Sequence, residues 1–214
     1  VTCNIPCVES FCTQEYPFEV VVIDNERPLG FGGNHNQAFL QCETEYFCIM
    51  NPDIQLMNDP FDALLTCDAN PAVAAVAPKI INSQGTTEDS ARYFPTPWGL
   101  AGKLFGLYDG VFPVRKDREI EYPDCLAGMF LLVNANKFSQ LGGFDKKYYL
   151  YYEDFDFCAR AWQEGFGVAL CQSSTVIHDA RRASHRDVWF FKLHFMSAAR
   201  FFWKHLGRFP KWRH

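Results

Sequence analysis

The chain has 214 residues, which suits one domain with a small appendage, and its hydrophobic content of 48% is ample for a sizeable core. No stretch approaches the ~20 consecutive apolar residues of a membrane span and no secretory leader is recognisable, so we expect a cytoplasmic protein, with peripheral attachment at the inner face of a membrane left open. The net charge of −5 conceals an asymmetry, because residues 179–214 hold nine of the 20 Lys and Arg but two of the 25 Asp and Glu; basic tails of this kind often meet phosphate or anionic lipid.

The first predicted strand covers residues 18–23 and leads into a glycine-rich turn, residues 29–36, with the sequence LGFGGNHN. Its three glycines allow the backbone to approach a ligand closely. Asn34 is the expected N-cap of a helix over residues 35–43. A glycine-rich turn before a helix can hold a phosphate, and it can equally be an ordinary tight connection.

A buried strand is predicted over residues 46–50, and it ends in Asn51, Pro52 and Asp53. In open α/β sheets, ligands collect outside the carboxyl ends of the strands. A carboxylate at this place suits a divalent cation, which takes oxygen ligands and leaves positions for a diphosphate. The alternative is a plain Asn-Pro-Asp turn. A helix over residues 60–68 follows, with an aspartate as its N-cap.

The middle of the chain alternates apolar strands with polar segments. Residues 73–81 form the next predicted strand, in which Pro78 indicates an edge position or a bend. Residues 82–124 are rich in Gly and Pro, and a loop of this length is usually a functional lid or a mobile segment. Residues 129–133 form a further strand, and a short helix over residues 136–141 follows it.

A double glycine and an aromatic run, residues 142–152, lead into two adjacent carboxylates, Glu153 and Asp154. The apolar residues after them recur at helical spacing, so both carboxylates are expected in the first turn of a helix, where the helix dipole favours negative charge. Aromatic neighbours would shield them from water, an environment in which a carboxylate can be tuned as a base. The segment alone favours the simpler interpretation of acidic capping residues.

Two short strands, residues 167–171 and 174–177, end at His178. Residues 187–206 then show a helical pattern of aromatic and basic residues. Such a helix can lie on an anionic membrane surface, or it can pack on its own domain. We therefore divide the chain into a main domain, residues 1–186, and a basic aromatic tail, residues 187–214.

The nine cysteines are an odd number, so they cannot all pair within the chain. Their spacing fits neither a zinc pattern nor a compact disulfide framework. We expect most of them to be small buried hydrophobic side chains in a reducing compartment.

Taken in order, these motifs resemble the family 2 inverting glycosyltransferases of the GT-A fold, most closely the rhamnosyltransferase-like branch of bacterial polysaccharide synthesis. Each motif is weak by itself, and six in the same order over roughly residues 18–186 are a specific signal. The matching segments are LGFGGNHN (29–36), NPD (51–53), ARYFPT (91–96), AGMFL (127–131), GGFD (142–145) and YEDFDFCAR (152–160), with His178 after them.

The resemblance implies an α/β fold with a mixed, mostly parallel sheet flanked by helices. It implies a Mg²⁺ or Mn²⁺ ion that neutralises the diphosphate of a dTDP- or UDP-sugar, and a general base that takes a proton from the hydroxyl of a glycan or lipid-linked acceptor. L-rhamnose is one candidate sugar, and no nucleic-acid partner is expected. By motif position, the base is Asp154, and Glu153 orients the acceptor or Asp154. The metal ligands are Asp53, Asn51 and His178, and the residues expected to stack on a sugar are Trp98 and Tyr152. The residues expected to contact the diphosphate are Gly30, Gly32, Asn36, Arg181 and Arg182.

The chain departs from the family at its start, because the glycine-rich turn comes too soon after residues 18–25 for the family's first two strands to fit. We therefore expect an N-terminally incomplete domain whose nucleoside site is missing or supplied from elsewhere. A non-catalytic remnant that keeps the fold, and a peripheral membrane module built on residues 187–206, are the alternatives to sugar transfer. For His178 a structural role at a strand end is about as plausible as a functional one. Arg181 and Arg182 could equally be solvated, and for Trp98 and Tyr152 core packing is the commoner role.

Overall fold

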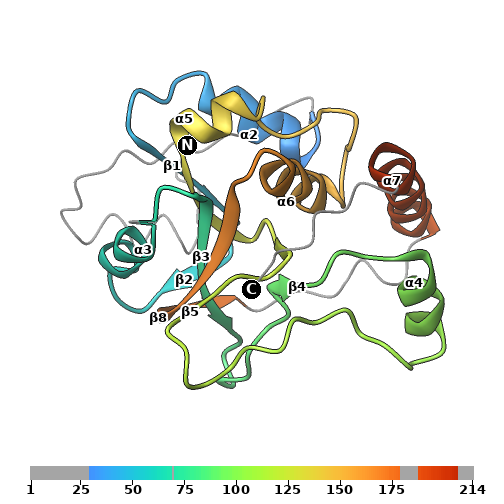
Figure 1. The fold of residues 1–214 in the computed structure, drawn as a ribbon, viewed down its shortest axis with the longest axis horizontal. Helices are drawn as coiled ribbons and strands as arrows, with labels where there is room; N and C mark the ends of the chain where they lie inside the picture. Colours follow the sequence, from blue (N-terminus) through green and yellow to red (C-terminus); the bar gives the residue numbers. More distant parts are fainter. Residues whose placement is uncertain (1–28, 69, 179–187, 207–214) are drawn as a thin grey trace.

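The fold was analysed in a computed structural model that describes residues 29–68, 70–178 and 188–206 (Figure 1). The strand expected at residues 18–23 lies outside the described residues. So do Arg181 and Arg182, which the sequence places at the diphosphate.

A six-stranded sheet forms the centre of the molecule (Figure 1). Its order is β1-β7-β3-β8-β2, and β5 pairs with β8 beside this path. The predicted strands at 46–50 and 73–81 are confirmed, whereas the two strands expected between residues 167 and 177 form one continuous strand. The strands are β1 (Tyr46–Met50), β2 (Ile54–Leu56), β3 (Val73–Ile81), β5 (Ile120–Glu121), β7 (Phe130–Asn134) and β8 (Gly167–His178).

The sheet is mixed, as expected, but it is not mostly parallel. Among the described residues, one of its five pairings, that of β3 with β8, is parallel. The expectation assumed helical crossovers, which return each strand parallel to the one before. Here β2 and β5 enter the sheet beside β8 without such a crossover, and β7 runs against both β1 and β3. Pro78 lies in a central strand, where the β3–β8 register shifts beside it, so the predicted bend is confirmed and the edge position is wrong.

Helices cover both faces of the sheet. The alternation of side chains along β7 shows the two faces, because Leu131 and Val133 join one core cluster while Phe130 and Leu132 join another. The first cluster lies under α2 (Phe31–Phe39), α5 (Ala135–Gln140) and α6 (Glu153–Gln163), and the second lies under α3 (Phe61–Cys67), as Figure 1 shows.

Residues 82–124 are more ordered than their composition predicts. They contain the short strand β4 (Ala91–Arg92), which pairs with β6 (Cys125–Leu126), and the helix α4 (Pro97–Leu104). Thr96 caps α4 by accepting a hydrogen bond from the Gly99 amide at 2.9 Å, and a proline follows at the first helical position. This segment therefore has a fixed path past the start of α6.

The last described helix, α7 (Val188–His205), packs on the main domain through one of its faces. Asp156 on α6 is fully buried, and its carboxylate contacts Arg160 at 2.8 Å, Lys204 at 2.7 Å and His205 at 2.8 Å. Ser197 also donates a hydrogen bond to the Leu150 carbonyl at 2.9 Å. Of the two predicted placements, packing on the domain is the one observed, although it uses half of the helix surface.

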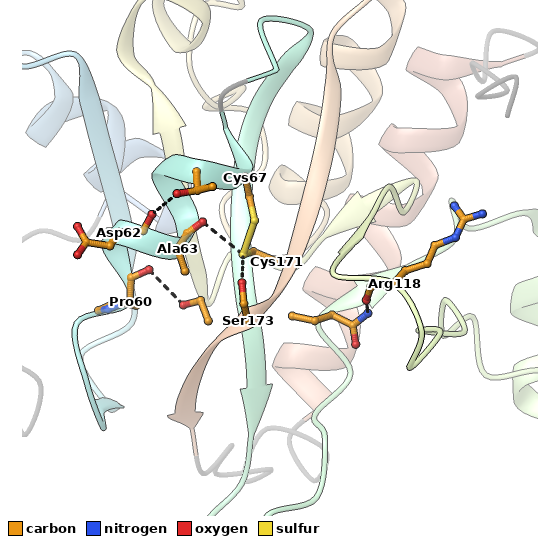
Figure 2. The surroundings of a disulfide bond; sticks show 10 residues. Pro60, Asp62, Ala63, Cys67, Arg118, Cys171 and Ser173 are labelled. Carbon is orange, nitrogen blue, oxygen red and sulfur yellow. Dashed lines mark hydrogen bonds between the residues drawn. A yellow bond between two sulfur atoms is a disulfide. The ribbon is translucent and has the colours of Figure 1, made fainter.

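A disulfide joins Cys67, at the end of α3, to Cys171 on β8 across 104 residues of sequence (Figure 2). The Ser173 hydroxyl lies 3.2 Å from the Cys171 sulfur. This pair corrects the expectation for two of the cysteines, because spacing along the chain carries no sign that a helix end will meet a strand. Cys125 and Cys158 are buried and free, as predicted for most of the set.

Candidate active site

Asp154 lies in the first turn of α6, where the sequence places it. Its carboxylate accepts a hydrogen bond from the Phe155 amide at 2.8 Å and another from the Gly128 amide at 3.2 Å. Gly128 comes just before β7 and packs against the Phe31 ring, which would lie 3.0 Å from an added Cβ. The general-base candidate is therefore held by backbone groups of two elements.

Asp53 and His178 form a second polar centre. Ile54 on β2 pairs with His178 at the end of β8, and this register brings the imidazole Nε2 to 3.1 Å from the Asp53 carboxylate. The histidine side chain is 5% exposed, whereas the Asp53 side chain is 43% exposed and faces solvent. Two residues that the sequence assigns to a metal, 125 positions apart, thus lie in contact.

A two-residue peptide connects these two centres. The backbone N–H of Asn51 donates a hydrogen bond to the Met129 carbonyl at 2.9 Å. The backbone N–H of the neighbouring Gly128 donates to the Asp154 carboxylate. Because Asn51 and Asp53 belong to the same turn, this turn and Asp154 lie on either side of residues 128–129. The turn that carries Asp53 and the carboxylate of Asp154 are therefore linked through the backbone of residues 128–129.

Arg92 on β4 belongs to the candidate site, although its motif at residues 91–96 gave no role for this residue. Its guanidinium is held by Asp89, with Nε 3.0 Å from the carboxylate, and lies over the Phe155 ring at 6.0 Å. Burial raises the pKa of Asp154, while the charge of Arg92 and the two backbone hydrogen bonds act to lower it. Arg92 therefore favours the ionised form of the base candidate.

Glu153 has the opposite environment. It is buried, and its Oε2 has no hydrogen-bond partner among the residues that the structure describes. Burial and the neighbouring charge of Asp154 raise the pKa of Glu153 to about 8. The pKa values of both adjacent carboxyl groups are therefore raised by burial, and the two groups influence each other's ionisation.

The glycines expected at the diphosphate pack closely against neighbouring residues, and their contact with a diphosphate stays a prediction. Gly30 has φ +80°, and an added Cβ would lie 2.2 Å from the Tyr149 carbonyl oxygen. At Gly32 the same atom would lie 2.7 Å from the Phe144 side chain. The helix also starts at Phe31, so its N-cap is Gly30 rather than Asn34. The turn thus fits closely against the loop before α6.

Asn36 serves the same loop. Its amide nitrogen donates to the Phe144 carbonyl at 2.7 Å, and its amide oxygen accepts from the Phe144 backbone N–H at 2.9 Å. Both polar groups of the side chain are therefore occupied by protein, and a contact with a diphosphate would require that these bonds break.

The backbone entering α6 is strained. Tyr151 and Tyr152 both have φ of 68°, in the left-handed region that residues with side chains seldom adopt. Each such residue costs about 1–3 kcal/mol and is commonly found at functional sites. Tyr152 is 3% exposed, with its ring 5.2 Å from His194 and 5.5 Å from Phe201. Core side chains cover this ring, so its predicted stacking on a sugar stays a prediction that would require those side chains to move.

Trp98 is 87% exposed on α4, which leaves its ring free to contact a ligand. Its predicted contact with a sugar stays a prediction.

The Asp53–His178 pair can form part of a site for Mg²⁺ or Mn²⁺. Its separation of 3.1 Å is close to the spacing of neighbouring ligands in an octahedral shell with bonds of about 2.1 Å. The Nε2 atom of His178 faces Asp53, whereas its buried Nδ1 atom has no hydrogen-bond partner among the described residues. Nδ1 therefore lacks a hydrogen bond whichever ring nitrogen carries the proton of the neutral imidazole. The described residues contain no group of three or more His, Cys, Asp or Glu that could hold a metal. Oxygens from Asn51 and a diphosphate would have to complete the set.

Comparison with known proteins gave related enzymes. A low-salt glycan biosynthesis hexosyltransferase of Haloferax volcanii is 24% identical over 165 residues, which cover 75% of this chain and 52% of that protein. An N-acetylglucosaminyl-diphospho-decaprenol L-rhamnosyltransferase of Mycobacterium tuberculosis is 28% identical over 196 residues, or 81% of this chain and 63% of the other. The rhamnosyltransferase WbbL of Escherichia coli is 26% identical over 164 residues, with shares of 71% and 61%. No family model matches the chain.

The chain thus spans between about half and two thirds of the length of these relatives. Among solved structures, a mannosyltransferase of Pyrobaculum calidifontis in complex with GDP-Man and Mn²⁺ aligns with 90% of this chain and 50% of its own, at a TM-score of 0.54 and 14% identity. GalNAc-T7 with UDP, GalNAc and Mn²⁺ aligns with 74% of this chain and 31% of its own, at a TM-score of 0.55 and 17% identity. The chain is therefore related in sequence to the rhamnosyltransferase-like glycosyltransferases, and its fold is the GT-A fold.

Proposed function

We propose that this chain forms part of an inverting glycosyltransferase that moves a sugar from a dTDP- or UDP-linked donor to a hydroxyl group of a glycan or lipid-linked acceptor. L-rhamnose is the candidate sugar that the named relatives favour. The observation that carries the proposal is the peptide of residues 128–129, which is hydrogen-bonded to the turn of Asn51 on one side and to Asp154 on the other.

In this proposal Asp154 removes the proton of the acceptor hydroxyl as that oxygen attacks the anomeric carbon, and the bond from that carbon to the diphosphate oxygen breaks. The attack comes from the face opposite the leaving group, so the configuration inverts. The charge of Arg92 favours the ionised form of Asp154 before the transfer. Glu153 lies beside the base at the start of the helix.

Asp53 and His178, with Asn51, would hold a divalent cation. When bound, such an ion supplies positive charge that stabilises the diphosphate as a leaving group. The residues themselves position the turn after β1 against β7, so that a bound donor would lie over residues 128–129 and face Asp154.

Replacing the base tests the assignment directly. We expect Asp154→Asn to reduce transfer by about 10²- to 10⁴-fold, the usual contribution of a general base, while donor affinity changes less than about twofold. Transfer is followed by product formation and donor affinity by calorimetry, with Asp62→Asn, exposed on α3, as the matched control. Equal losses of donor binding and transfer would contradict the role of Asp154.

The proposed cation site has its own test. We expect sugar nucleotides with Mn²⁺ to raise the melting temperature of the protein, and Asp53→Ala to remove the dependence of this shift on Mn²⁺. The absence of a shift with any dTDP- or UDP-sugar would instead favour a non-catalytic protein that has kept the fold.

A further inference from the structure

The outward face of α7 is apolar and open to solvent. The opposite face is buried against α6 and the loop before it, through Ser197, Ala198, Phe201 and His205. Four large apolar side chains point away from that contact, and each is at least 66% exposed: Phe191, Phe195, Trp203 and Leu206. Proteins seldom expose a row of such residues unless it binds something.

A second exposed apolar group lies on the same side of the molecule, where Figure 1 shows α4 and α7 both projecting from the body. It consists of Trp98, Phe105 and Leu107, each more than three-quarters exposed. The segment before α4 contacts α7 directly, since the rings of Phe94 and Phe201 are 6.5 Å apart. The two exposed groups are therefore carried by segments that pack on each other through buried rings.

The charges on α7 have one sign. Residues 188–205 contain no Asp or Glu, and Lys192 is exposed among the apolar side chains. At the edge of α7 a cavity of about 130 Å³ is bordered by two cations, Lys147 and Arg200. The Arg200 Nε is buried without a hydrogen-bond partner among the described residues. The cavity is lined by Lys147, Tyr149, Leu193, Met196, Ser197 and Arg200.

We propose that α7 lies on an anionic lipid surface, with its exposed aromatic side chains at the boundary of headgroups and acyl chains and a lipid phosphate between Lys147 and Arg200. Aromatic residues with flanking cations are typical of helices that lie in the membrane interface. A second copy of the chain is a poorer occupant, because a symmetric contact would place the same cations opposite one another.

This placement would bring a lipid next to the candidate active site. His194 on α7 packs 5.2 Å from the Tyr152 ring, and the next residue along the chain is Glu153. None of the described helices is both long and apolar enough to cross a membrane, so α7 would lie along the surface. If the proposed transfer is correct, a lipid-linked acceptor would reach Asp154 from this side.

The test is flotation of the protein with vesicles of phosphatidylcholine, with and without one third phosphatidylglycerol. We expect binding to the anionic vesicles only, and weaker binding at high salt. Trp203→Ser should weaken it about tenfold, the usual effect of one large apolar side chain. The double variant Lys147→Gln with Lys192→Gln should weaken binding to the anionic vesicles about fivefold for each positive charge removed. Leu40→Ser, at the 84% exposed residue that follows α2, and Lys116→Gln, in an exposed loop, are the matched controls.

Equal binding to neutral and anionic vesicles, or equal effects of the surface variants and their controls, would overturn the proposal. Dimerisation abolished by Trp203→Ser would assign the face to a second copy instead. Inorganic phosphate at constant ionic strength should leave vesicle binding unchanged, and displacement by it would assign the cavity to a soluble anion. All variants change exposed side chains, so their melting temperatures should match that of the wild type. Since flotation needs no activity, it is independent of the proposed transfer.

Discussion

Adjacent carboxylates at the start of α6 differ because their surroundings differ. Asp154 receives two backbone N–H groups and lies near a guanidinium, whereas Glu153 is buried and its Oε2 lacks a partner among the described residues. Like charges so close cannot both form at low cost, and at Asp154 the charge of Arg92 and the backbone N–H groups favour the ionised form. The division of roles between the two residues follows from this difference in hydrogen bonding.

Arg92 should set the pH at which the base becomes active. Its charge lowers the pKa of Asp154, so Arg92→Gln should move the acidic limb of the pH–rate profile to higher pH. The measurement is transfer rate against pH. Arg92→Lys should restore part of the shift, and Arg118→Gln, in an exposed loop, should cause none. A variant that is slower with an unchanged profile would show that Arg92 has another role.

Glu153 should make stability depend on pH. Its pKa is about 8 in the folded protein and 4.5 without the protein environment, so its contribution is fully present below pH 4.5 and is lost as the pH rises through 8. We expect Glu153→Gln to melt at a higher temperature than the wild type at pH 8.5, with a smaller difference at pH 5. Glu164→Gln, exposed at the other end of α6, is the control. A difference independent of pH would contradict the assignment.

At the scale of elements, α6 and α7 are joined through one buried acid. Burial would raise the pKa of Asp156, but hydrogen bonds and charges from His205, Arg160 and Lys204 lower it to about 2. The stability that this acid contributes is present above pH 3.8 and is lost as the pH falls through 2. The site helix and the proposed lipid-facing helix therefore stay together across the physiological range.

Removing this charge should destabilise the whole protein. Asp156→Asn leaves Arg160 and Lys204 without this buried counter-charge, and breaking a buried ion pair typically costs about 3–5 kcal/mol in the free energy of unfolding. Urea unfolding followed by circular dichroism measures the loss. Asp62→Asn, on the exposed side of α3, should change it by less than about 0.5 kcal/mol. A similar small change for Asp156→Asn would show that the α6–α7 contact depends on apolar packing instead.

At the scale of the molecule, the disulfide between α3 and β8 closes a loop of 104 residues (Figure 2). Cross-links of this span restrict the unfolded chain, and a loop of about 100 residues corresponds to about 4–5 kcal/mol. We expect a reducing agent to lower the free energy of unfolding by that order, as followed by urea titration. The double variant Cys67→Ala with Cys171→Ala should show no further response to reductant. A wild type that is equally stable when reduced would contradict the prediction.

The features that could be predicted from the sequence are those that depend on residues close together along the chain. The start of α6 and the strands at residues 46–50 and 73–81 were predictable because the pattern of apolar residues repeats within each segment. The pairing of Asp53 with His178 was found through motif order rather than through any local pattern.

The features that were missed depend on contacts between distant segments. In the sequence, Tyr152 is an aromatic residue two positions before the candidate base, and its burial involves α7, more than 35 residues further along. The antiparallel pairings of β2 and β5 with β8, and the contact of Cys67 with Cys171, likewise depend on how separate segments pack. Single residues do not encode such contacts.

The peptide of residues 128–129 has a consequence for how specificity can diverge. It contacts the turn after β1 and the start of α6 through main-chain atoms, apart from the carboxylate of Asp154 itself. Replacement of neighbouring side chains could therefore reshape the pockets for donor and acceptor while the spacing of the reacting groups stays constant. An insertion or deletion in this strand entry would alter that spacing at once, so we expect variation among related sequences to occur by exchange of residues rather than by change of length.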